Sequence, residues 1–149
     1  MIDGATELKD LGKTEANKKL VEGFVHDVLM GENMAALPSY YDGNNYIQHN
    51  PGIADGLDGL GKALADMAAA GLKMVYYKNH KILGEGNFVL SVSEGEFCDR
   101  YVAFYDLFRV ENGKIAEHWD AIEDIPAEDK WLNKNGKNDY AMLYLNSFL

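Results

Sequence analysis

The sequence is short of several residue types, and each shortage excludes a class of protein. A single cysteine, Cys98, rules out an internal disulfide, and without CxxC spacing it gives no signal for structural zinc. We interpret Cys98 as a small, partly buried hydrophobic residue. Only three prolines indicate few rigid linkers. No window approaches the roughly 18 consecutive apolar residues of a membrane span, and the amino terminus lacks the apolar region of a secretory signal.

Basic residues are also scarce, with 14 lysines and arginines against 24 aspartates and glutamates, so the formal net charge is −10. Nucleic acids and anionic membranes require a positive surface on their partner, so we expect neither to bind. We expect the protein in the cytoplasm. The 149 residues, 47% of them apolar, suit one folded domain with one core. We assign that domain to residues 14–149, after a loosely held lead-in over residues 1–13.

The first half of the chain carries helical patterns. Apolar residues recur at i, i+4 and i+8 over residues 14–31, which predicts an amphipathic helix that ends near Gly31. We expect a short second helix over 33–40 and a third over 57–70. Between them, residues 46–50 are typical of a short strand, although they are more polar and aromatic than a purely structural strand would be.

The second half of the chain alternates between apolar and polar residues, which indicates strands over 72–83, 87–97, 101–110 and 115–122. Asn112 and Gly113 favour the positive φ angles of a two-residue type I′ turn, and short turns make neighbouring strands antiparallel. The tail, residues 126–149, is expected to end in a short helix or strand that covers a sheet edge. Helices before long strands indicate an α+β fold, whose twisted sheet leaves a cone-shaped cavity.

The last predicted hairpin, residues 104–123, carries the strongest chemical signal. Side chains alternate along a strand, so His118 and Asp120 share one face. A carboxylate in an apolar pocket becomes a usable general base or acid, and a neighbouring histidine can orient it or share its proton. The alternatives are a rim carboxylate paired with a basic residue and a histidine bonded to the backbone.

A second candidate group is the run Gln48, His49 and Asn50. All three side chains can donate a hydrogen bond to an oxygen, which suits an enolate or a carbonyl. The alternative is a loop cluster that satisfies its own backbone. The aromatic residues near the two groups could line a hydrophobic cleft or belong to the core: Tyr40, Tyr41, Tyr46, Tyr105 and Trp119.

A metal site is a further alternative. His118 and Asp120 could ligate from one strand with His49 as the third ligand, which would give two histidines and one carboxylate. The chain contains no HxH or HExxH spacing. We therefore expect no metal.

Two segments resemble a known family. Residues 46–60, YIQHNPGIADGLDGL, and residues 105–123, YDLFRVENGKIAEHWDAIE, are similar to the SnoaL-like polyketide cyclases of the nuclear transport factor 2-like (NTF2-like) superfamily. The resemblance covers most of residues 14–125. It implies a cone-shaped, NTF2-like (cystatin-like) α+β fold, with three helices packed on a curved, mostly antiparallel sheet.

The resemblance also implies a reaction. Well-understood members of the family close a ring on an aromatic polyketide by intramolecular aldol condensation, without metal or coenzyme, and their acid/base aspartate matches Asp120. His118 matches the histidine of the HWD motif, and the Gln48-His49 segment matches positions near the pocket. Glu123 stands where the family usually has glutamine, which adds a second carboxylate near the expected pocket mouth.

We therefore expect an enzyme without a cofactor, in which Asp120 removes a proton α to a carbonyl of a small hydrophobic substrate. His49 and Gln48 would stabilise the enolate, and His118 would tune or share the proton. Asn50 and the aromatic residues Tyr41, Tyr46, Tyr105 and Trp119 would contact the substrate. Two alternatives stay open: a small-molecule binding protein without catalysis, and an isomerase, lyase or hydrolase that uses the same pocket.

The residues on the strand faces opposite the expected pocket predict how the protein assembles. Large apolar residues are expected there, namely Phe104, Phe108 and Trp119. An exposed apolar face of this kind usually marks an interface, and a two-fold dimer is the commonest way to cover it. The sequence therefore predicts a homodimer.

Overall fold

The computed structural model describes residues 3–137. The helices are α1 (Thr14–Phe24), α2 (Leu37–Tyr40) and α3 (Gly56–Ala69), and a π-helical turn, Val25–Met30, continues α1. The strands are β1 (Ile47–Gln48), β2 (Met74–Glu85), β3 (Phe88–Phe97), β4 (Arg100–Glu111) and β5 (Lys114–Asp124). Short 3-10 turns cover Leu11–Lys13, Met34–Ala36, Gly43–Asn45 and Glu128–Lys130. No helix within the described part of the chain is long and apolar enough to cross a membrane.

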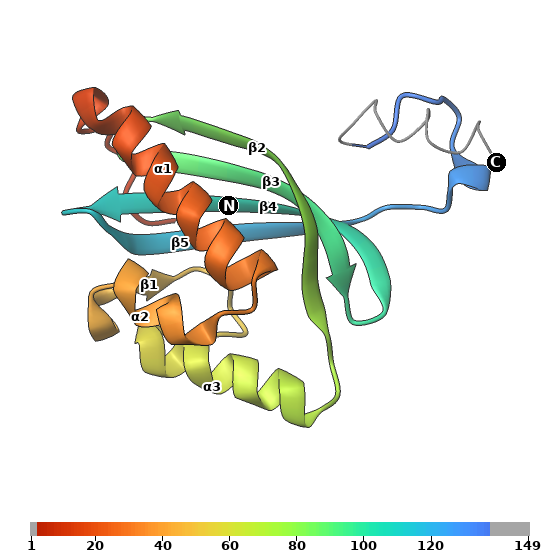
Figure 1. Ribbon diagram of the computed structural model, residues 1–149, viewed down its shortest axis with the longest axis horizontal. Helices are drawn as coiled ribbons and strands as arrows, with labels where there is room; N and C mark the ends of the chain where they lie inside the picture. The colour runs from red at the N-terminus through yellow and green to blue at the C-terminus, as the bar shows by residue number, and fades with distance from the viewer. Residues whose placement is uncertain (1–2, 138–149) are drawn as a thin grey trace.

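The five strands form one curved sheet in the order β1-β5-β4-β3-β2, in which β1 runs parallel to β5 and the other pairs are antiparallel. Helix α1 crosses one face of this sheet, which we call the inner face, while α2 and α3 lie beside β1 (Figure 1). The α+β architecture expected from the sequence is confirmed, and the long strands begin and end within about two residues of the expected bounds.

The core lies between α1 and the inner face of the sheet. Val21 and Phe24 of α1 and Val25 and Val28 of the π-helical turn are buried there. They pack in one cluster with residues of the sheet and its edge, namely Tyr41, Tyr46, Val89, Phe108, Val110 and Ile115. Burial of each such side chain stabilises the fold by roughly 1.5–3 kcal/mol, so α1 is held by its apolar stripe.

Two tight turns connect the last three strands, and only one of them was expected from its residue types. Asn112 and Gly113 have φ angles of 51° and 72°, as the predicted type I′ turn requires. The turn between β3 and β4 uses Cys98 and Asp99, which have φ angles of 51° and 62° although neither is glycine. This second turn has no strong sequence signal, because cysteine at position 98 seldom adopts a positive φ angle.

A bulge in the β4–β5 hairpin reverses one expectation. Val110 pairs with Ile115, but Arg109 pairs with Glu117, so Ala116 is an extra residue on β5. One extra residue moves every later side chain to the other face of the sheet. Phe104 and Phe108 therefore lie on the same face as His118 and Asp120, and both are buried. The expectation that they form an exposed face opposite the pocket is wrong.

Residues 3–10, which we call the N-terminal strap, are bound to the sheet rather than loosely held. The indole Nε1 of Trp119 donates to the carbonyl of Asp3 over 2.7 Å. The backbone of Lys9 donates to Asn87 Oδ1 over 2.8 Å and accepts from Asn87 N over 2.9 Å. Trp119 does lie on the outer face, as expected, but it is only 7% exposed. The expected element at the end of the tail lies largely outside the described residues.

Candidate functional site

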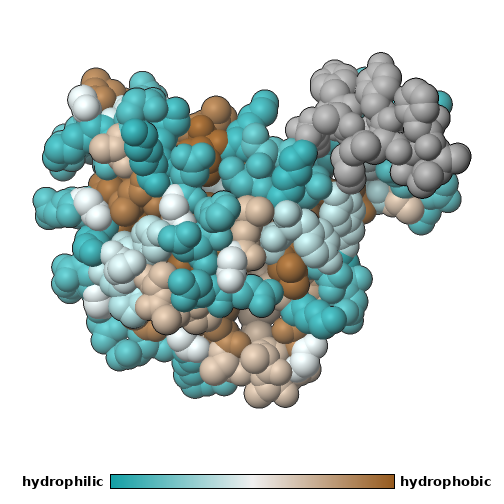
Figure 2. Space-filling model, viewed as in Figure 1, coloured by the Kyte–Doolittle hydropathy of each residue, from teal (hydrophilic) through white to brown (hydrophobic). Residues whose placement is uncertain are grey.

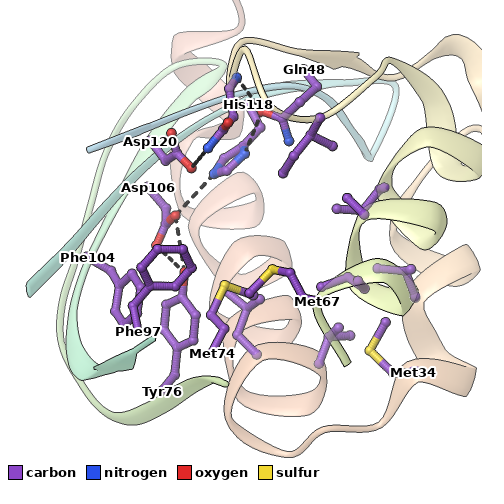
Figure 3. A pocket seen from close by; sticks show the side chains of 18 of the residues that line it. Met34, Gln48, Met67, Met74, Tyr76, Phe97, Phe104, Asp106, His118 and Asp120 are labelled. Carbon is purple, nitrogen blue, oxygen red and sulfur yellow. Dashed lines mark hydrogen bonds and ion pairs between the residues drawn. The ribbon is translucent and has the colours of Figure 1, made fainter. Parts of the chain in front are cut away.

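A cavity of about 940 Å³ opens between the inner face of the sheet, the end of α1 and helix α3. Figure 3 shows that its two ends differ: Gln48, Asp106, His118 and Asp120 gather at one end, and Met67 and Met34 lie away from them. Most of the molecular face seen in Figure 2 is hydrophilic, with hydrophobic side chains gathered in its lower part, over α3. The cavity is thus apolar along most of its wall and polar at one end.

Strands β4 and β5 build the polar end. Asp106 pairs with Asp120 across the two strands, and Phe108 pairs with His118, so all four side chains share the inner face. Asp106 is only 2% exposed. Its Oδ1 lies 3.1 Å from His118 Nε2, and the hydroxyl of Tyr76 donates weakly to both carboxylate oxygens over 3.3 and 3.4 Å.

The hydrogen bonds around Gln48 indicate a proton on Nδ1 of His118. Gln48 Nε2 donates to the Tyr46 hydroxyl over 2.8 Å, and Gln48 Oε1 accepts from the backbone N–H of Asn50 over 3.0 Å. Gln48 Oε1 is therefore an acceptor, so His118 Nδ1, 3.3 Å away, must donate to it. Nε2 faces the Asp106 carboxylate, so the His118 ring bridges Gln48 and Asp106. The structure thus pairs His118 with Asp106 and not with Asp120.

Asp120 is half-buried at the cavity wall and is oriented by Asn50, whose Nδ2 donates to Asp120 Oδ2 over 2.8 Å. Within residues 3–137, the other carboxylate oxygen of Asp120 accepts no hydrogen bond. A carboxylate that lines the cavity and is held at one oxygen is well placed to accept a proton from a ligand.

Three buried tyrosines surround this end. Burial raises the pKa of Tyr41, Tyr46 and Tyr76 well above the usual value of 10.0. The nearby carboxylates raise it further, Asp106 for all three tyrosines and Asp120 for Tyr46 and Tyr76. These hydroxyls therefore stay neutral and can donate. Because the Tyr46 hydroxyl oxygen accepts from Gln48, its own proton is available for a ligand oxygen.

Asp106 is the site residue that sequence reasoning missed. A signal for it exists, since Asp106 stands between Phe104 and Phe108 in an alternating strand and so occupies an inward, apolar position. The second carboxylate of the site is Asp106 and not Glu123. Glu123 lies outside the cavity, where a hydrogen bond from Lys137 lowers the pKa of Glu123.

The cavity contains some of the expected ligand-contacting residues but not all. Gln48, Asn50, Tyr41 and Tyr46 line it, whereas Tyr40, Tyr105 and Trp119 do not. His49 lies on the outer face, where its ring stacks on Trp119 at 4.6 Å and its Nε2 is 2.7 Å from Glu117 Oε1. The expectation that His49 shares a pocket with Asp120 is wrong, because the alternation of side chains continues from β1 into the next residue and puts Gln48 and His49 on opposite faces.

The position of His49 on the outer face also rules out the metal site considered from the sequence. His49 cannot join His118 and Asp120 around one ion, because the sheet lies between them. Among residues 3–137, no group of three or more His, Cys, Asp or Glu side chains is arranged to hold a metal ion.

Comparison with known proteins gives similarity in structure only. No protein-family model and no curated protein sequence matches the chain. A putative ketosteroid isomerase from Kribbella flavida is 13% identical with a TM-score of 0.61, over 85% of this chain and 96% of that one. An NTF2-like protein of unknown function from Cytophaga hutchinsonii is 21% identical with a TM-score of 0.56, over 80% of this chain and 95% of that one.

A third solved structure is an LEH-like epoxide hydrolase from M. tuberculosis, which is 21% identical with a TM-score of 0.55, over 74% of this chain and 85% of that one. Together these similarities establish an α+β, NTF2-like fold for the described chain. A fold hosts many reactions, so the reaction has to be inferred from the site.

Proposed function

We propose that the protein is an acid/base enzyme that needs no cofactor and enolises a small hydrophobic carbonyl compound, as SnoaL-like polyketide cyclases do. The observation that supports this most is the placement of Asp120. Its carboxylate faces a large apolar cavity, is oriented by Asn50, and lies at the same end as neutral tyrosine donors. Such a set can remove a proton and stabilise the oxygen on which charge develops.

The proposed reaction begins with the ligand carbonyl at the polar end of the cavity. Asp120 takes a proton from the α-carbon, the C–H bond breaks, and its electron pair forms the enolate. The carbonyl oxygen gains negative charge and accepts a hydrogen bond from the Tyr46 hydroxyl. Asp120 then returns the proton to a different carbon of a conjugated enolate, which is an isomerisation. Alternatively, the enolate carbon bonds to a second carbonyl carbon, whose oxygen takes the proton from Asp120; loss of water then completes an aldol condensation.

The pair of His118 and Asp106 has a separate role in this proposal. Both ring nitrogens of His118 are occupied by Gln48 and Asp106, so we assign it an electrostatic role in place of proton transfer. A protonated His118 offsets the charge of Asp106 in a site that contains two carboxylates. It also places a positive charge near the developing enolate, where a charge fixed in advance stabilises the transition state.

The charge and shape of the cavity suggest the substrate class. Its volume of about 940 Å³ lies near the upper end of common ligand pockets. Asp106 and Asp120 give the polar end a negative potential that also raises the pKa of Tyr46 and Tyr76. A carboxylate ligand would be repelled there, so the substrate is a neutral ketone or aldehyde. Met34, Met67 and Met74 form a wall that adapts to ligand shape.

Two other functions make use of the same site. A water molecule bound by Asp120 beside Asn50 would make the protein a hydrolase, and the orientation of the carboxylate by Asn50 favours that function. A ligand carrier without catalysis is favoured by the mainly apolar cavity wall. Both require the cavity, but neither requires exchange of a ligand's α-proton.

Incubation of neutral hydrophobic ketones with the protein in heavy water tests the proposal. We expect catalytic incorporation of deuterium at the α-carbon. Ala63→Phe should block it, because Ala63 lines the cavity from α3, whereas Ala65→Phe on the exposed side of the same helix should not. A ketone that binds without exchange would favour the carrier, and turnover of an epoxide or ester without ketone exchange would favour the hydrolase.

A further inference from the structure

A buried charge cluster lies on the outer face of the sheet, behind the polar end of the cavity. The Glu117 carboxylate is 2% exposed, and it is bound by Arg109 Nε over 2.6 Å and by His49 Nε2 over 2.7 Å. The His49 ring stacks on Trp119 with an angle of 7° between the planes. The proposed function uses none of these residues.

The N-terminal strap closes over this cluster at Gly4. Gly4 has a φ angle of +103°, and a Cβ there would overlap Glu117 Oε1 and lie 2.8 Å from His49 Nε2. Only glycine fits such a position without strain. The neighbouring carbonyl of Asp3 accepts a hydrogen bond from Trp119 Nε1. The strap therefore lies against Trp119 at Asp3 and against His49 and Glu117 at Gly4.

The cluster and the cavity are joined by three consecutive residues. Gln48 faces inward and accepts from His118, His49 faces outward and contacts Glu117, and Asn50 returns inward and donates to Asp120. Strand β1, which begins this run, is two residues long, and the backbone N–H of His49 adds one bond to the carbonyl of His118. So short a strand has few backbone bonds to fix its side chains.

We propose that the N-terminal strap, His49 and Glu117 are positioning elements for the cavity. By holding His49 on the outer face, they fix Gln48 against His118 and Asn50 against Asp120. The kinetic consequence of this inference rests on the proposed function, but its structural consequence does not. A substitution on the outer face should therefore change the position and hydrogen bonding of the His118 ring, through His49 and Gln48.

Two variants test the inference. Gly4→Ala places a methyl group against the pair of His49 and Glu117, and Trp119→Phe removes the donor to Asp3 while it keeps an aromatic ring. Lys19→Ala is the control, since Lys19 is exposed on α1 and lies outside both the strap and the cavity lining. Protein with nitrogen-labelled histidine rings reports on His118 by NMR, and His118→Gln assigns its signals.

We expect both variants to shift or broaden the ring N–H signals of His118 while Lys19→Ala leaves them unchanged. If α-proton exchange is measured, kcat should fall by up to about 100-fold with little change in KM, because a misplacement of about 1 Å costs on that order. Wild-type His118 signals in either folded variant would overturn the inference. If Gly4→Ala does not fold, Trp119→Phe decides. A wild-type protein without exchange would refute the proposed function, and the NMR comparison would then decide alone.

Discussion

The buried tyrosines at the polar end of the cavity predict a loss of stability at alkaline pH. Tyr41, Tyr46 and Tyr76 are 4%, 2% and 6% exposed, and burial raises the pKa of each above the usual value of 10.0. In the unfolded chain all three would ionise above that pH, while in the folded protein they keep their protons. The stability that these groups contribute is therefore fully present below about pH 10 and is lost as the pH rises.

The size of the effect follows from the number of groups. Each tyrosine that ionises only on unfolding lowers the free energy of unfolding by about 1.4 kcal/mol per pH unit above 10, so three together remove about 4 kcal/mol at pH 11. Domains of this size have roughly 5–15 kcal/mol of stability in total. Urea unfolding followed by circular dichroism, at about pH 9 and pH 11, measures the loss.

A pair of variants separates the tyrosines from other alkaline effects such as lysine deprotonation. Tyr46→Phe removes one of the three groups, so its loss between the two pH values should be smaller than that of the wild type by about 1.4 kcal/mol. Tyr105→Phe, whose hydroxyl is 3.5 Å from Glu123 outside the cavity, should lose as much as the wild type. Equal losses in all three proteins would refute the view that the Tyr46 hydroxyl is held neutral by a dry, negative site.

Three further predictions concern the site and the assembly. Asp106→Ala should lower the free energy of unfolding by about 3–5 kcal/mol, because in the proposed site it leaves the charge of a protonated, partly buried His118 without its partner; a loss no larger than that of the surface variant Asp124→Ala would contradict the pairing. A hydrophobic ketone should bind more tightly than a carboxylic acid of the same size in calorimetry at neutral pH, and the reverse order would contradict the negative potential. We also expect a homodimer, and a strict monomer of 16.6 kDa in sedimentation would contradict it. That expectation now depends on exposed apolar residues outside the cavity, namely Tyr77, Leu83 and Tyr101.

Local sequence signals predicted the fold well, because each acts over a few residues. The alternation from residue 72 onward and the Asn-Gly turn gave the strands and one hairpin, and the spacing of apolar residues gave α1 and α3. The predicted face of the last hairpin depended on counting from the turn. The bulge at Ala116 shifts the register by one residue, so counting from the turn assigns the later side chains to the wrong face. An alanine at that position gives no sequence signal for a bulge.

Local patterns also placed some of the expected site residues around one cavity. Asp120, Gln48, Asn50 and Tyr46 do line one cavity. His49 was misplaced because the face that a two-residue strand turns inward is set by its pairing with β5, which is distant in sequence. The hydrogen bonds of the N-terminal strap are likewise long-range, so its composition alone suggested a loose segment.

The most direct test of the account is α-proton exchange by Asp120→Asn, measured together with thermal melting on the same sample. The substitution keeps the shape and can keep an acceptor for Asn50, but it removes the base. We predict that exchange falls by roughly 10²- to 10⁴-fold, the usual contribution of general acid–base catalysis, while the melting temperature changes little or rises. Asp124→Asn, on the same strand and outside the cavity, is the matched control and should keep full exchange. A lower melting temperature with unchanged exchange per folded Asp120→Asn molecule would contradict the central claim.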